Sequence, residues 1–217
     1  MPNSRSSSVA LILVDLQNDF LPGGALAVPK GDEVLPIAER MIADGNFAWI
    51  VATQDWHPAN HGSFASNNPG AQVGSLGRLH GLDQVMWPDH CVQGTKGADF
   101  ADGPMKQAIL AGRVHKIFQK GTDPTVDSYS GFFDNGRRKS TGLAEFLREK
   151  GVTEVVVLGL ATDYCVKFTA LDAVQQGFKT TVVRDGSRAV NLHPDDEARA
   201  IAEMEKNGVQ ILRSHEV

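Results

Sequence analysis

The residues of this chain that could carry out chemistry lie directly after short apolar runs. Asp15 ends the run VALILV, Asp55 and His57 follow a second run, Lys120 follows a third and Cys165 follows a fourth. A carboxylate, an ammonium group and a thiol are groups that can activate a nucleophile and move its proton. If these runs are parallel strands, their carboxyl ends meet at the edge of the sheet where ligands bind. The sequence therefore predicts a reactive site at that edge.

Cys165 lies in the stretch GLATDYCV, where a buried strand is expected to pass into a helix. Thr162 or Asp163 could cap this helix and place the thiol in its first turn, where backbone N–H groups and the helix dipole favour a thiolate. Lys120 would lower the thiol pKa further, Asp15 could accept the proton, and the same N–H groups could stabilise an oxyanion. A buried structural cysteine explains the position equally well.

Asp55 and His57, in the pattern D-W-H, form a candidate metal site. Residues i and i+2 of an extended chain project to the same side, and this pair offers one oxygen and one nitrogen ligand. A third ligand must come from elsewhere, with His90 preferred and His61 or Ser63 as alternatives. The competing interpretation is a turn carboxylate beside a surface histidine, because a D-x-H pattern has low specificity.

The elements that must position these residues follow from the apolar pattern. Runs without strict alternation, most of them rich in β-branched residues, are typical of strands buried on both faces of a parallel sheet. These runs are Val9–Val14, Phe47–Ala52, Val114–Phe118, Val155–Leu160, Thr180–Val183 and Val209–Leu212. Between them, helical signals occur at Asp32–Ala43, Thr141–Glu149, Asp163–Gln176 and Pro194–Lys206. Strands that alternate with helices predict a three-layer α/β domain.

Residues 60–104 interrupt this alternation. The segment is rich in Gly, Asn, Pro and Asp and shows little apolar periodicity, so we expect a long structureless insertion, which in a compact domain is usually functional. A solvated surface excursion is the alternative. Trp87 and three of the seven histidines lie in the segment, which favours a loop region that shapes the site.

Length and charge limit the classes of function. A chain of 217 residues is expected to form one domain over residues 8–217, preceded by a flexible tail over residues 1–7. The net charge of −5 and the scattered basic residues argue against a nucleic-acid partner.

The first apolar run is too short to span a membrane and lacks a signal-peptide cleavage pattern. With only two cysteines, Cys91 and Cys165, the expected location is the cytoplasm.

Five segments occur in the order found in one known family. They are VDLQNDF at 14–20 followed by GGAL at 23–26, TQDWHP at 53–58, WPDHCV at 87–92, KG at 120–121, and GLATDYCV at 159–166. Together they resemble the isochorismatase-like cysteine hydrolases, and most closely the nicotinamidases, also called pyrazinamidases. The resemblance extends along nearly the whole chain and implies a six-stranded, mostly parallel sheet with helices on both faces.

The resemblance also implies roles for residues. It makes Asp15, Lys120 and Cys165 a catalytic triad, and it implies a cis peptide bond between Leu160 and Ala161 that directs the N–H groups of Ala161 and Cys165 toward an oxyanion. It further implies one divalent ion, commonly zinc, although iron or manganese also suits such ligands. The implied ligands are Asp55, His57 and His90, with Ser63 or His61 completing the shell. Many members are dimers or larger, so a homo-oligomer is expected.

The implied reaction is hydrolysis of nicotinamide to nicotinate and ammonia, and of pyrazinamide in the same way. In the family mechanism, the metal binds the ring nitrogen and Cys165 attacks the carboxamide carbon. Asp15 passes the thiol proton to the departing ammonia, Lys120 balances the charges, and water hydrolyses the thioester. The walls of the ring site would be Phe20, Leu26, Trp87 and Tyr129, with core packing as the alternative for Leu26 and Tyr129.

Other classes of protein make different predictions. A metal-free cysteine amidase of the same family, such as a carbamoyl-amide or ureido hydrolase, would share the triad but not the set Asp55, His57 and His90. A non-catalytic small-molecule-binding relative would be expected to lack a triad residue, and all three are present. A nucleotide-binding Rossmann protein needs a glycine-rich loop after the first strand, and residues 15–19 contain no glycine.

Overall fold

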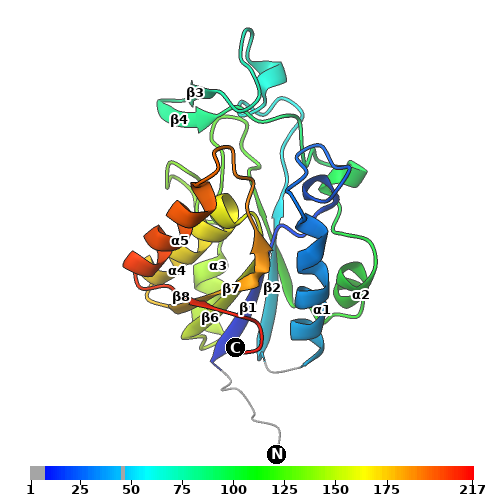
Figure 1. The fold of residues 1–217 in the computed structure, drawn as a ribbon, viewed down its shortest axis with the longest axis vertical. Coiled ribbons are helices and arrows are strands. Elements are labelled where there is room, and N and C mark those ends of the chain that lie inside the picture. The colour runs from blue at the N-terminus through cyan, green and yellow to red at the C-terminus, as the bar shows by residue number, and fades with distance from the viewer. Residues whose placement is uncertain (1–7, 45–46) are drawn as a thin grey trace, which may run out of the picture.

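A six-stranded parallel sheet forms the centre of the structure, a computed structural model that describes residues 8–44 and 47–217 (Figure 1). The predicted tail at residues 1–7 lies outside the described residues. The strand order is β5-β2-β1-β6-β7-β8, and every neighbouring pair is parallel. The strands are β1 Val9–Val14, β2 Trp49–Asp55, β5 Lys116–Lys120, β6 Glu154–Leu160, β7 Lys179–Arg188 and β8 Gln210–Leu212. The predicted α/β sheet is thus confirmed.

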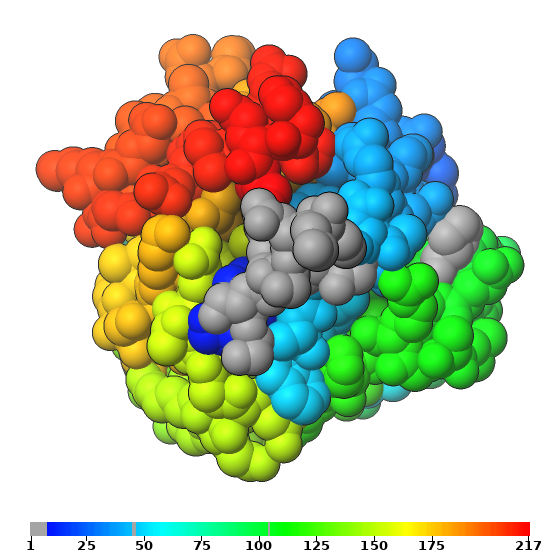
Figure 2. All heavy atoms as spheres, turned by 90° about the horizontal axis from the view of Figure 1, so that it is seen from below, coloured from blue at the N-terminus to red at the C-terminus, as the bar shows by residue number. Residues whose placement is uncertain are grey.

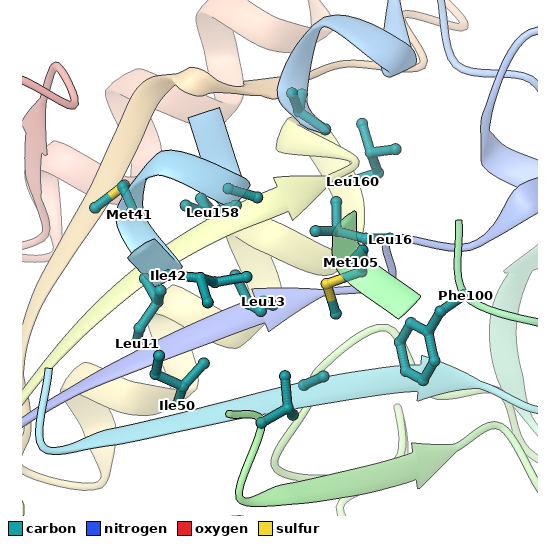
Figure 3. Packing of buried hydrophobic residues seen from close by; sticks show 14 of the residues in the cluster. Leu11, Leu13, Leu16, Met41, Ile42, Ile50, Phe100, Met105, Leu158 and Leu160 are labelled. Atoms are coloured by element: carbon teal, nitrogen blue, oxygen red, sulfur yellow. The ribbon is translucent and has the colours of Figure 1, made fainter. Parts of the chain in front are cut away.

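Helices cover both faces of the sheet (Figure 1). The helices are α1 Leu35–Ala43, α2 Pro104–Leu110, α3 Leu143–Glu149, α4 Lys167–Gln175 and α5 Asp196–Lys206. Alternate residues of β1 face opposite layers: Leu11 and Leu13 pack in one core with Met41 and Ile42 of α1, as Figure 3 shows, whereas Ile12 packs in the core of α3, α4 and α5. Burial on both faces is the reason why the strands lack alternation in the sequence.

The order of the strands creates a switch point between β1 and β6. The chain winds from β1 through β2 to β5 and then returns to the other side of β1 to form β6. Because parallel crossovers are right-handed, this reversal sends the connecting helices to opposite faces and opens a crevice at the carboxyl ends of β1 and β6. Asp15 follows β1 and Cys165 follows β6, so the fold brings these two residues to that crevice.

Several boundaries differ from the prediction. Strands β2 and β5 extend three and two residues farther than their apolar runs, because the ladder continues through polar pairs such as Gln54 with Gln119 and Asp55 with Lys120. Asp55 and Lys120 are therefore the last residues of strands and not the first residues of loops. Helix α2, which has only seven residues, was not predicted.

The expectation that residues 60–104 are structureless is wrong. Strands β3 Leu76–Leu79 and β4 Leu82–Val85 form an antiparallel hairpin that lies beyond the end of the main sheet in Figure 1. Its two turn residues, His80 and Gly81, both have positive φ, as a tight type I′ hairpin turn requires. The sequence signal was weak because His replaces the usual Asn or Asp at the first turn position.

The C-terminal residues lie against the helix that precedes β2. Figure 2 shows the red C-terminal segment beside the blue atoms of the α1 region, and Arg40 of α1 donates a hydrogen bond of 3.0 Å to the Ser214 hydroxyl. Within the described residues, none of the helices has the length and apolar character needed to cross a membrane.

Candidate active site

Asp15, Lys120 and Cys165, hereafter the thiol cluster, meet at the carboxyl ends of β1, β5 and β6. The Lys120 Nζ lies 2.9 Å from Asp15 Oδ2 and 3.4 Å from Cys165 Sγ. All three side chains are buried. The structure thus brings together the carboxylate, the ammonium group and the thiol that the sequence singled out, and the ammonium group lies between the other two.

The Lys120 ammonium group is held by four neighbours. Besides Asp15 and Cys165, it donates to Asp55 Oδ1 at 3.1 Å and to the carbonyl oxygen of Ser128 at 2.9 Å. Burial by itself lowers the pKa of Lys120, but the carboxylates of Asp15 and Asp55 raise it more, so the pKa lies well above its usual range. Lys120 is therefore a fixed positive charge.

Asp15 is held in place by Thr53 of β2. The Thr53 hydroxyl donates to Asp15 Oδ1 at 2.5 Å and accepts a hydrogen bond of 3.2 Å from the Asp15 backbone N–H. Asp15 has a φ of 48°, a left-handed conformation that aspartate adopts more readily than most residues. Burial raises the pKa of Asp15, Lys120 opposes this, and the net pKa stays above the ordinary value. A carboxyl of this kind is suited to accepting and returning a proton.

The expected thiolate at Cys165 is not the resting form that the structure favours. Burial and the carboxylates of Asp15 and Asp55 raise the pKa of the Cys165 thiol well above its usual range, although Lys120 acts in the opposite direction. Attack by the thiol on a substrate thus requires a base that takes the proton as the bond forms. Asp15 is the carboxylate in this position, since the same Lys120 ammonium contacts both residues.

The predicted helix cap before Cys165 is also wrong. The chain forms a π-helical turn at Thr162–Val166 before α4, with Ala161 at its N-terminal end, and no side chain caps it. The Asp163 carboxylate instead accepts hydrogen bonds from the backbone N–H groups of Val190 and Asn191, at 2.9 and 2.8 Å. Asp163 therefore joins the segment after β7 to the turn Thr162–Val166 that contains Cys165.

The peptide bond between Leu160 and Ala161 is cis, as the resemblance implied. Immediately before it, Gly159 has a φ of +133°, and a Cβ at this position would lie 2.1 Å from the carbonyl oxygen of Val14. Only glycine allows this close approach of β6 to β1. That the N–H groups of Ala161 and Cys165 bind an oxyanion stays a prediction.

Asp55, His57 and His90, hereafter the histidine cluster, lie beside the thiol cluster. Asp55 Oδ2 is 3.0 Å from His57 Nε2 and 3.3 Å from His90 Nε2, and the three possible ligand atoms lie within 4.8 Å of one another. The other ring nitrogens face backbone carbonyls, with His57 Nδ1 at 2.9 Å from Gly121 and His90 Nδ1 at 2.8 Å from Pro88. This leaves both Nε2 atoms available as ligands, so the residues fit a divalent ion.

His61 and Ser63, the two alternatives for a fourth ligand, are both buried next to this cluster. The ring centroids of His57 and His61 are 4.2 Å apart, and His61 Nδ1 is 2.7 Å from the Ser63 hydroxyl. His61 Nε2 has no hydrogen-bond partner among the residues that the structure describes. His61 also forms a second group of possible ligands with His57 and Asp127.

A cavity opens in front of both clusters. Cys165 lines it together with Asp55 and His90, so the thiol and two possible metal ligands face one space. The four residues that were predicted as ring walls all line it. The remaining lining residues are Phe20, Leu26, Trp87, Asp127, Tyr129, Ala161, Tyr164 and Val190.

The model of the Isochorismatase domain matches residues 9–216. The chain belongs to the isochorismatase family. It is 52% identical over 204 residues to a nicotinamidase of Escherichia coli (strain K12), covering 93% of each chain. Among solved structures, an Acinetobacter baumanii nicotinamidase pyrazinamidase is 41% identical with a TM-score of 0.89, covering 97% of this chain and 98% of the other. A pyrazinamidase of Pyrococcus horikoshii in complex with zinc is 40% identical with a TM-score of 0.75, covering 95% and 99%.

Sequence reasoning missed several residues of this isochorismatase-family site. Thr53 contacts Asp15 and Asp127 lies near His57, but Thr53 is neither a ligand nor a nucleophile in the segment TQDWHP, and Asp127 lies outside the five family segments. Tyr164 and Val190, which line the cavity, were also missed. Thr53 is one strand away from Asp15 in space but 38 residues away in the chain. A search for polar residues near the carboxyl end of β2 would have found Thr53, whereas no local signal marks Val190.

Proposed function

We propose that this chain is a nicotinamidase that hydrolyses nicotinamide to nicotinate and ammonia, and pyrazinamide to pyrazinoate. The observation that carries the proposal is the position of Lys120 Nζ between Asp15 Oδ2 and Cys165 Sγ, at 2.9 and 3.4 Å, where Cys165 shares a cavity with the possible metal ligands Asp55 and His90. The nicotinamidases among the chain's relatives support the choice of amide. The reaction is an amide hydrolysis through a covalent thioester.

In the first half of the reaction, Asp15 takes the proton of the Cys165 thiol while the sulfur bonds to the carboxamide carbon. The N–H groups of Ala161 and Cys165 would receive the negative charge that develops on the carboxamide oxygen. The C–N bond then breaks, and Asp15 returns the proton to the nitrogen, which leaves as ammonia. Lys120 stays protonated and offsets the negative charges of the cluster.

In the second half, a water molecule attacks the thioester carbon and gives a proton to Asp15. The C–S bond breaks, the proton on Asp15 restores the Cys165 thiol, and the product acid loses its own proton to solvent and leaves as nicotinate. A raised pKa suits Asp15 to both directions of transfer, because it makes the protonated form more accessible than in an ordinary carboxyl group.

The histidine cluster would hold one divalent ion through Asp55, His57 and His90. Zinc is the metal of the Pyrococcus horikoshii relative, and iron or manganese also suits two imidazoles and a carboxylate. When bound, the ion would supply a Lewis acid for the ring nitrogen of the substrate. The unpartnered Nε2 of His61 supports His61 over Ser63 as a further ligand, because the Ser63 hydroxyl is already bonded to His61.

The alternative of a metal-free cysteine amidase is disfavoured by the same cluster. Two imidazole Nε2 atoms within 3.3 Å of a buried carboxylate oxygen form a ligand set for which a metal-free enzyme has no need. A cytoplasmic location and a homo-oligomeric state stay predictions. The two free cysteines are consistent with a reducing compartment.

The test is ammonia release from nicotinamide by the purified protein and by Cys165→Ala. We expect release by the wild type and none above background by the variant. Cys91→Ala is the matched control, since Cys91 packs in the core on the α1 side and does not line the cavity, and it should retain activity. Equal rates for wild type and Cys165→Ala, or no release by the wild type, would overturn the proposal.

A further inference from the structure

Gln84 is the buried residue of a hairpin whose other strand residues are exposed or half-buried. Its side chain is 2% exposed, whereas Leu76 on the partner strand β3 is 71% exposed. Burying an amide is unfavourable unless its donors and acceptors are bonded. The hydrogen-bond partners of Gln84 therefore show which part of the structure β4 contacts.

The Gln84 amide reaches from β4 to the wall of the cavity. Its Nε2 lies 2.9 Å from Asp127 Oδ2, 3.0 Å from the Tyr129 hydroxyl and 2.8 Å from the carbonyl oxygen of Val85. Asp127 and Tyr129 both line the cavity, 43 and 45 residues away in the chain. One side chain of the hairpin thus links two wall residues that come from a different segment.

Asp127 depends on Gln84 for one of its carboxylate oxygens. Oδ1 accepts a hydrogen bond of 2.7 Å from the Ser128 N–H and lies 4.0 Å from His57 Nε2, beside the histidine cluster. Within the described part of the chain, Gln84 is the hydrogen-bond partner of Oδ2. Since Asp127 is 3% exposed, loss of this donor would leave a buried charge without its partner and move the carboxylate.

Tyr129 is oriented by the same amide. Its hydroxyl accepts from Gln84 Nε2 and from Trp87 Nε1, at 3.0 and 3.1 Å, which occupies both lone pairs. Its ring packs edge-on against Tyr164, another residue of the cavity wall, with centroids 5.4 Å apart. A ring held by two donors and an aromatic neighbour presents a fixed surface to the cavity.

We propose that Gln84 is a positioning residue that holds Asp127 and Tyr129 in the cavity wall, so that the β3–β4 hairpin determines how tightly the pyridine or pyrazine carboxamide is bound. The inference rests on the proposed function. Gln84 makes no hydrogen bond to the thiol cluster, so it acts on binding rather than on the bond-breaking steps. A contact of this kind affects KM more than kcat.

The primary variant is Gln84→Met, which keeps the length of the side chain and removes its hydrogen bonds. We expect the KM for nicotinamide to rise about tenfold with kcat changed less than about twofold, which corresponds to about 1.4 kcal/mol of lost binding. Gln84→Glu should raise KM further, because it places a carboxylate against Asp127. The matched control is Gln72→Ala, an exposed glutamine of the same segment, and its KM should equal that of the wild type.

A double-mutant cycle with Asp127→Asn separates positioning from a general structural role. If Gln84 acts through the charge of Asp127, Gln84→Met costs less in KM in the Asp127→Asn background than in the wild type. Nicotinate binding by calorimetry should weaken in parallel, while melting curves report folding. Unchanged KM and unchanged nicotinate binding in folded Gln84→Met, with an active wild type, would overturn the inference alone. An inactive wild type would overturn the proposed function and this inference with it.

Discussion

Lys120 Nζ and Asp55 Oδ1 lie 3.1 Å apart, so one ion pair joins the thiol cluster to the histidine cluster. The two oxygens of Asp55 have different partners: Oδ1 faces Lys120, and Oδ2 faces the imidazoles of His57 and His90. Asp55 holds the lysine charge with one oxygen and offers the other as a ligand. The geometry of the possible metal site is therefore tied to the position of the ammonium group near the thiol.

Replacing Lys120 with methionine should destabilise the protein and abolish activity. The change leaves the buried carboxylates of Asp15 and Asp55 without their shared cation, and removal of one partner from a buried ion pair costs about 3–5 kcal/mol. Urea unfolding measures the loss. Lys116→Met, at the exposed first position of the same strand, is the control and should cost about 1 kcal/mol or less, since an exposed ammonium group over the Phe118 and Phe146 rings is lost. Equal losses for the two variants would contradict the assigned charge network.

Replacing Asp55 with alanine should remove the ion that we propose the histidine cluster holds. The variant loses the carboxylate that lies within 3.3 Å of both Nε2 atoms, and the metal content of the purified protein should fall from about one ion per chain to a small fraction. Elemental analysis after dialysis gives the stoichiometry. Asp89→Ala, an exposed carboxylate next to His90 in the chain, should keep its metal. Stoichiometric metal in Asp55→Ala would show that the ligand set is wrong.

The sequence predicted the sheet because burial on both faces leaves a clear apolar signal. It did not predict the ends of β2 and β5. The backbones of residues such as Gln54 and Lys120 pair in the sheet, but their side chains are polar and make polar contacts, so the apolar pattern stops before the strand ends. The hairpin of β3 and β4 was missed for a similar reason. Its strands have only four residues each, and most of their side chains are exposed or half-buried, so they lack a hydrophobic pattern.

The sequence predicted those site residues that have a reactive side chain and also follow or end an apolar run. Asp15, Asp55 and Cys165 satisfy both conditions, and the structure places all three around the Lys120 ammonium group. Thr53 and Gln84 do not, because each acts through a partner that is distant in the chain and near only after folding. The pKa direction of Cys165 was also beyond sequence reasoning, since it depends on burial beside two carboxylates.

Thr53→Val should shift the acid side of the pH–activity profile upward. The Thr53 hydroxyl lowers the pKa of Asp15 by donating to its carboxylate, in opposition to burial, which raises it. Without that donor the Asp15 pKa rises further. Because the thiol proton must pass to an unprotonated Asp15, kcat/KM is lost as the pH falls through this pKa, and the loss should begin at a higher pH in the variant.

The profile is measured as kcat/KM for nicotinamide from about pH 4 to pH 9, a range chosen to bracket the ordinary pKa values of carboxyl and thiol groups. Thr180→Val is the control, since Thr180 is a buried threonine on β7 whose hydroxyl donates to the carbonyl oxygen of Phe178, away from Asp15. Its acid limb should match the wild type. An acid limb in Thr53→Val that stays in place or moves to lower pH would argue against Asp15 as the proton acceptor.

Gly159→Ala should unfold or strongly destabilise the protein, whereas Gly151→Ala should not. Both glycines have positive φ, +133° and +68°, but a Cβ at Gly159 would lie 2.1 Å from the Val14 carbonyl oxygen, and a Cβ at Gly151 would meet no atom within 4 Å. Gly151→Ala should cost about 1–2 kcal/mol of unfolding free energy, the strain of a left-handed alanine. Gly159→Ala adds the separation of β6 from β1 and should cost about 2–6 kcal/mol in total. Because Val14 immediately precedes Asp15 and Gly159 begins the segment 159–166 that contains Cys165, any folded Gly159→Ala should also have a reduced kcat. Equal unfolding free energies of the two variants in urea would show that the close approach of β1 and β6 at Gly159 does not contribute to the stability of the fold.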